Sequence, residues 1–94
     1  MGELQIQGER VRLGFVKTEV EACLTAVQLA EFELRSGNVT AAEQNIRVLE
    51  EGTATLRRFL PGLAAEQRQE LHPQLAQIEG ALDGLKQKLR RKLG

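Results

Sequence analysis

The chain has 94 residues, its 13 basic and 13 acidic side chains balance, and 41% of its residues are hydrophobic. A chain of this length has room for one domain, and this composition excludes an intrinsically disordered protein, which is poorer in apolar residues and usually carries a net charge. The single cysteine, Cys23, excludes a small secreted scaffold held together by intramolecular disulfides.

The first predicted helix covers residues 9–36, and residues 1–8 are expected to form a flexible N-terminal segment. Apolar or small residues recur here in steps of three and four, which places them on one face of a helix. Gly37 is expected to end this helix, because glycine adopts the left-handed conformation without steric cost. Cys23 shares the apolar face and should be buried. The face consists of Val16, Val20, Cys23, Val27, Ala30 and Leu34.

The second predicted helix covers residues 40–60. The run from Thr40 to Glu43 matches a capping box, in which the threonine hydroxyl accepts from the amide of Glu43 and the glutamate reaches back. Proline and glycine at positions 61 and 62 then mark a bend. The apolar positions again follow steps of three and four: Val39, Ala42, Ile46, Leu49, Thr53, Leu56 and Leu60.

The third predicted helix covers residues 64–92 and has the most regular heptad pattern of the three, as in a coiled coil. Pro73 interrupts it, because proline lacks an amide proton and clashes with the preceding turn. Residues 64–72 are therefore either the kinked first part of this helix or a separate short helix, and the continuous apolar phase across Pro73 favours the kink. The pattern consists of Leu71, Leu75, Ile78, Leu82, Leu85 and Leu89.

Short connections make consecutive helices antiparallel, so the sequence predicts an all-α fold, a three-helix up-down-up bundle. The second helix is the shortest, and the basic C-terminal end, residues 86–94, is therefore expected to overhang the bundle. No apolar run approaches the roughly 20 residues of a membrane-spanning helix. The first residues also lack the basic and apolar regions of a signal peptide, so we expect a cytoplasmic protein.

The stretch from residue 30 to residue 46 resembles the helical hairpin of tetratricopeptide repeats and of three-helix MIT domains. Both families place a glycine in the turn, a hydrophobic residue two positions later and a small residue three positions beyond, as do Gly37, Val39 and Ala42. Leu49 departs from the tetratricopeptide pattern, which prefers alanine there, and no second repeat follows. The resemblance implies a module that binds peptide segments or helices in grooves between its own helices.

The sequence offers no candidate catalytic, cofactor-binding or metal-binding residues. His72 is the only histidine and Asp83 the only aspartate, whereas metal sites draw on clusters of His, Cys and carboxylate side chains. Cys23 and His72 are residue types that could form a catalytic pair, but a thiol in the first apolar face is expected to be buried and unreactive. We therefore expect a protein that is not an enzyme.

A second apolar stripe on the first helix indicates a binding surface. Val11, Phe15, Thr18, Ala22, Thr25, Leu29 and Phe32 also follow steps of four and three, about 160° around the helix from the first face. Either a wider intramolecular packing or a partner must cover this stripe. The simplest solution is a homodimer or higher oligomer, and a helix of another protein is the alternative. The interface residues expected are Val11, Phe15, Ala22, Leu29 and Phe32.

The basic C-terminal end supports an alternative function, the binding of phosphates in nucleic acid or in anionic lipid. Nucleic acid is disfavoured because the rest of the chain is acidic and has few aromatic residues to stack on bases. Cations at a helix C-terminus also complement the helix dipole by about 0.3 to 1 kcal/mol without any ligand. The candidate anion contacts are Lys86, Lys88, Arg90, Arg91 and Lys92.

Overall fold

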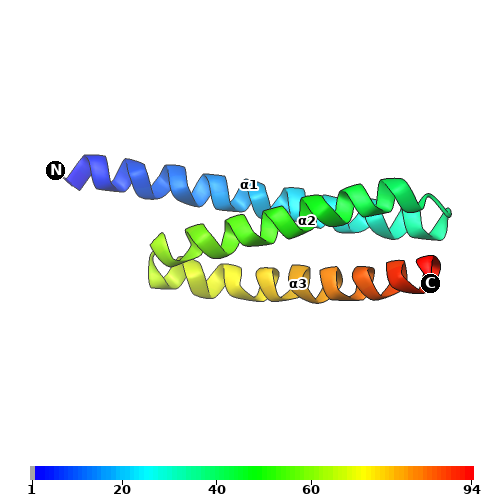
Figure 1. The fold of residues 1–94 in the computed structure, drawn as a ribbon. Coiled ribbons are helices and arrows are strands. Elements are labelled where there is room, and N and C mark those ends of the chain that lie inside the picture. The colour runs from blue at the N-terminus through cyan, green and yellow to red at the C-terminus, as the bar shows by residue number, and fades with distance from the viewer. Residues whose placement is uncertain (1) are drawn as a thin grey trace.

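The computed structural model describes the backbone of residues 2–94 and the side chains of residue 8 and residues 10–94. Three antiparallel helices, α1 (Gly2–Arg35), α2 (Val39–Phe59) and α3 (Ala65–Leu93), form an elongated bundle of 56 × 18 × 16 Å (Figure 1). A single 3-10 turn, η1 (Leu60–Gly62), joins α2 to α3. The all-α, up-down-up bundle predicted from the sequence is therefore confirmed.

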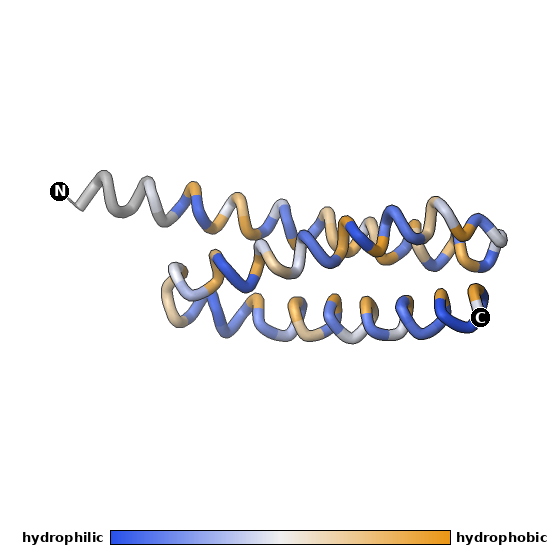
Figure 2. Tube along the Cα trace, viewed as in Figure 1, coloured by the Kyte–Doolittle hydropathy of each residue, from blue (hydrophilic) through white to orange (hydrophobic). Residues whose placement is uncertain are grey.

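Each helix contributes one face to a single core along the bundle axis. In Figure 2 the hydrophobic residues of α3 face the other two helices, and its hydrophilic residues lie on the opposite side. The first apolar face predicted for α1 is buried, except that Val27 is only partly buried. The core residues with 0 to 2% exposure are Val16, Cys23, Ala30, Ala42, Leu49, Leu56, Ile78 and Leu85.

The connection between α1 and α2 is a Schellman turn followed directly by a helix cap. Gly37 has a φ of 81°, its amide donates to the carbonyl of Leu34, and the Asn38 amide donates to the carbonyl of Glu33 at 2.8 Å. The Asn38 side chain then accepts from the amide of Ala41 at 3.2 Å and caps α2. Asn38 therefore ends one helix and begins the next.

The predicted capping box at Thr40 is wrong. Helix α2 begins at Val39, so Thr40 already lies in the first turn and its exposed side chain caps nothing. The physical reason is the tightness of the turn: once Gly37 and Asn38 have closed α1, the chain enters α2 at the next residue, and only position 38 is left for the cap.

Pro73 does not break the third helix. Helix α3 is continuous from Ala65 to Leu93, so residues 65–72 form its first turns and not a separate helix. The Pro73 ring is exposed to solvent, and the apolar phase from Leu71 to Leu75 continues through it. The packing of these leucines against the core compensates for the one backbone hydrogen bond that proline removes.

Two predictions about the ends of the bundle need correction. Helix α1 begins at Gly2, so residues 2–8 continue the helix; the isolated Gly8 lowers helix stability by only about 1 kcal/mol and does not stop it. The overhanging end is the N-terminus of α1, whereas the end of α3 lies level with the α1–α2 turn (Figure 1). The turn η1 adds roughly 6 Å to the return path of α2, at about 2 Å per residue, which is about half of the roughly 12 Å by which α3 is longer than α2.

Candidate interaction surface

Three side-chain contacts fix how α1 and α2 lie against each other. The Asn45 amide donates to Glu33 Oε1 near the turn, Cys23 lies against Gly52 in the middle, and the rings of Phe15 and Phe59 meet edge to face with centroids 5.2 Å apart. The sequence numbers rise along one helix as they fall along the other. Residues that lie between these contacts on α1 and on α2 are therefore at matching heights along the bundle axis. Leu29 of α1, for example, is level with Val48 of α2.

Helices α1 and α2 approach each other closely at Cys23 and Gly52. A Cβ atom built on Gly52 would lie 2.5 Å from Cys23 Sγ, so glycine is the residue that this approach allows. Burial raises the pKa of the Cys23 thiol above its ordinary value, and the nearby negative charge of Glu19 adds to the effect. The thiol is 1% exposed, as predicted from its position in the first apolar face.

Glu33 is a charged residue in the α1–α2 contact and is only 9% exposed. One carboxylate oxygen accepts from Asn45, and the other is buried without a hydrogen-bond partner. Buried polar groups without partners lower stability. The α1–α2 contact thus contains one polar pair, Glu33 and Asn45, in which one carboxylate oxygen has no hydrogen-bond donor.

The second apolar stripe of α1 lies on the surface. Val11, Phe15, Leu29 and Phe32 are 73, 44, 48 and 60% exposed, and Ala22 is exposed as well. Figure 2 shows hydrophobic positions both on the side of α1 that faces α3 and on the side turned away from it. Within residues 2–94 no helix covers this stripe, so the wider intramolecular packing considered from the sequence does not occur there.

Helix α2 extends the exposed stripe sideways. Val48 is 50% exposed and Phe59 is 37% exposed. Phe59 contacts Phe15 of α1, and Val48 shares the face of α2 that carries Gly52 and Phe59, which follow it by four and eleven residues. Phe15 and Phe59 also line a shallow, mostly apolar depression of about 320 Å³ together with Val11, Arg12 and Gly8. We call the whole surface the α1–α2 apolar face. It consists of Val11, Phe15, Ala22, Leu29, Phe32, Val48 and Phe59.

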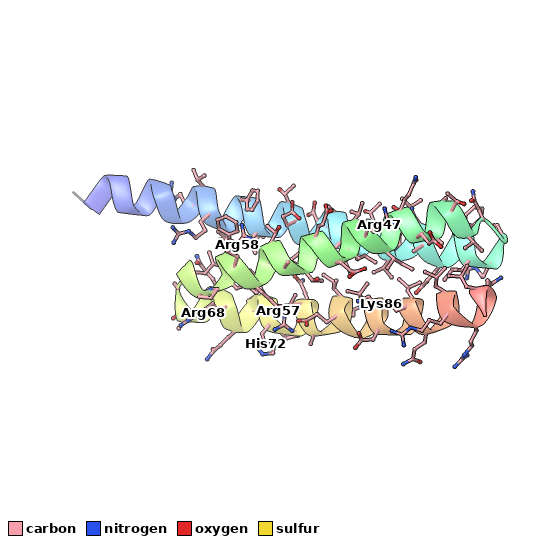
Figure 3. The ribbon with its side chains drawn as sticks, viewed as in Figure 1. Arg47, Arg57, Arg58, Arg68, His72 and Lys86 are labelled. Carbon is pink, nitrogen blue, oxygen red and sulfur yellow. The ribbon has the colours of Figure 1, made fainter. Side chains whose placement is uncertain are left out.

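The basic residues near the C-terminus do not form one patch. Lys88, Arg91 and Lys92 line a depression of about 410 Å³ with Arg35, Leu34 and Glu31 of α1. Lys86 instead pairs with Glu50 of α2 at 3.3 Å, on the side of α3 visible in Figure 3. Arg90 is exposed and does not line the depression.

The structure does not bring Cys23 and His72 together. Cys23 is buried between α1 and α2, whereas His72 points to solvent from the outer side of α3 (Figure 3). The described part of the chain holds no group of three or more His, Cys, Asp or Glu residues arranged to bind a metal ion. No helix in that part is long and apolar enough to cross a membrane.

Sequence reasoning missed three residues of these surfaces: Val48 and Phe59 in the apolar face, and Arg35 in the basic depression. Val48 and Phe59 both stand outside the main apolar pattern of α2, and a search for a second stripe on that helix would have found them. Comparisons with protein-family models, with curated proteins and with solved structures found no match.

Proposed function

We propose that this protein is a non-catalytic helical interaction module that self-associates through the α1–α2 apolar face. The observation that supports the proposal is the distribution of large exposed apolar side chains. The described residues include seven such side chains, and six of these lie on this face. Contiguous apolar patches on a small soluble domain are typical of protein interfaces.

The composition of the face also suits an interface. Phe15, Phe32 and Phe59 are all the phenylalanines of the chain, and none of them is in the buried core. Aromatic side chains carry large contact areas and often dominate binding energies. A domain of this size gains little stability from its own core, which makes further burial through association favourable.

Light scattering coupled to size exclusion tests this function. At tens of micromolar we expect a dimer for the wild type and a folded monomer for Phe15→Glu with Leu29→Glu. Leu93→Glu is the matched control, because Leu93 is 62% exposed but lies at the end of α3, away from the face; this variant should remain dimeric. A monomeric wild type would contradict the proposal, and so would unfolding of the double variant, since the stripe would then stabilise the monomer itself.

The basic depression supports a second candidate function, the binding of a phosphate-bearing group. Four cationic side chains from two helices surround it, with Glu31 as the single acid. Arg91→Glu with Lys88→Glu should then abolish chemical-shift changes caused by inorganic phosphate, whereas Lys86→Glu should not. Salt separates the two functions: phosphate binding weakens with ionic strength, and apolar self-association does not.

A further inference from the structure

The exposed stripe of α1 has nearly the same order of residue types in both directions from Ala22. Going outward, it has Thr18 and Thr25, then Phe15 and Leu29, then Val11 and Phe32. Small residues lie at the centre and large apolar residues at nearly equal distances on both sides. In a two-fold symmetric interface each residue contacts the position that mirrors it on the second copy. This pattern therefore suits pairing of α1 with an antiparallel copy of itself.

We infer that two copies of this chain pair through antiparallel α1 helices, with the two-fold axis passing close to Ala22. The inference rests on the proposed self-association and specifies its geometry. Phe15 then meets Leu29 of the partner subunit, and Val11 meets the partner's Phe32. Close approach at the centre is allowed because alanine and threonine are small.

Helix α2 completes two equal apolar clusters in this arrangement. Phe59 packs on Phe15, and Val48 is level with Leu29. The symmetry that brings Phe15 to the partner's Leu29 therefore also brings it to the level of the partner's Val48. Each cluster contains Phe15 and Phe59 of one subunit with the partner's Leu29 and the partner's Val48. One axis thus accounts for six of the seven large apolar side chains exposed in the described residues.

A parallel pair would not use α2 in this way. In a parallel two-fold pair, the α2 flank of one α1 meets the opposite flank of the other α1. That opposite flank carries the exposed polar residues Lys17, Glu21 and Gln28. Val48 and Phe59 would then face polar and charged side chains, whereas the antiparallel pair places like flanks together and keeps both residues in apolar surroundings.

The size of the face indicates a moderate affinity. The stripe from residue 11 to residue 32 is roughly 32 Å long at 1.5 Å per residue. Two helices about 10 Å apart give it a width of roughly 20 Å. The product, roughly 600 Å² per subunit, is below the ~800 Å² of a standard interface. We therefore expect a dissociation constant in the micromolar range.

Disulfide formation between engineered cysteines tests the direction of pairing. Thr18→Cys and Thr25→Cys variants, one of them labelled with ¹⁵N, are mixed and oxidised gently, and mass spectrometry separates mixed from self-paired disulfides. The antiparallel pair should yield the mixed disulfide, because two copies of position 18 lie roughly 11 Å apart along the axis. Native Cys23 is buried and serves as the internal control. Self-paired disulfides of both variants would overturn the antiparallel geometry while leaving self-association intact.

A charge substitution gives a second, independent readout. Lys17 and Gln28 lie on the same flank of α1 at nearly mirrored positions about Ala22, and both are exposed. Gln28→Glu therefore places a carboxylate opposite the partner's Lys17 twice in the antiparallel dimer, which should tighten it roughly twofold to tenfold. In a parallel dimer residue 28 would instead face the α2 flank of the other copy, so the same substitution places a charge beside the exposed Val48 and weakens association. A weaker dimer would overturn the geometry, and a monomeric wild type would overturn the proposed function itself.

Discussion

The close approach of Cys23 and Gly52 makes Gly52→Ala a sensitive probe of the α1–α2 contact. The new Cβ would lie 2.5 Å from Cys23 Sγ, whereas apolar heavy atoms pack best at about 3.5 to 4.0 Å. Overpacking of this kind costs about 1 to 3 kcal/mol. Alanine in place of glycine inside a helix raises stability by about 1 kcal/mol through its higher helix propensity. We therefore expect Gly52→Ala to lower the free energy of unfolding by about 0 to 2 kcal/mol.

Gly80→Ala is the matched control for this substitution. Gly80 lies inside α3 and is exposed, and a Cβ atom at this position would meet no neighbouring side chain within 4 Å. Only the helix-propensity gain applies there, so this variant should be stabilised by about 0.5 to 1 kcal/mol. For a domain of this size that corresponds to a rise of roughly 2 to 8 °C in Tm.

A double-mutant cycle isolates the contact itself. Cys23→Ala alone removes buried sulfur and should cost about 1 kcal/mol. In the Cys23→Ala background the clash is gone, so Gly52→Ala should become stabilising, with a coupling energy of about 1 to 3 kcal/mol. Urea unfolding at one fixed protein concentration measures all four proteins, since dimerisation makes stability depend on concentration. Equal stabilisation by Gly52→Ala and Gly80→Ala in the native background would refute the close contact.

Three further substitutions test local features of the bundle. Asn38→Ala should lower the free energy of unfolding by about 1 kcal/mol because it removes the cap of α2, whereas Thr40→Ala should change it by less than about 0.5 kcal/mol. A larger loss of Tm for Thr40→Ala than for Asn38→Ala in thermal melts would show that Thr40 caps the helix. Cys23 should react with a thiol reagent far more slowly than in the unfolded chain. Because burial raises the pKa of this thiol in the folded state, its contribution to the free energy of unfolding is present below about pH 8.5 and is lost as the pH rises further. Cys23→Ala should reduce this loss of stability in urea titrations between about pH 8 and about pH 10. Asn45→Ala should cost about 1 to 3 kcal/mol because it leaves both oxygens of Glu33 without a donor, and the cost should shrink in a Glu33→Gln background; equal costs in both backgrounds would show that the hydrogen bond contributes nothing.

The periodic features of the sequence predicted the fold well. Steps of three and four placed Val16, Cys23 and Leu34 on the buried side of α1, because a helix repeats its faces every 3.6 residues whatever its neighbours are. The same periodicity predicted that Phe15, Leu29 and Phe32 share one face, which the structure shows to be exposed. The binding role of that face remains a prediction.

Features that depend on how the helices meet could not be read from the sequence. The cap moved from Thr40 to Asn38 because the closure of α1 determines where α2 begins. A second stripe on α2 would have indicated Val48 and Phe59, but that Phe59 lies beside Phe15 depends on the register of α1 and α2. The basic end did not overhang because the turns at both ends of α2, and not α2 alone, span the length that α3 matches (Figure 1).

The unequal packing of the three helices has a consequence for how the molecule opens. Helix α1 packs more extensively against α2 than α3 packs against either. We therefore expect detachment of α3 about the Leu60–Gly62 turn to be the opening with the lowest free energy. Amide hydrogen exchange should then report lower protection across α3 than across the middle of α1 and α2. Because the α1–α2 apolar face includes no residue of α3, a subunit opened in this way would retain its whole pairing surface. Equal protection in all three helices would instead indicate that the bundle opens as one cooperative unit.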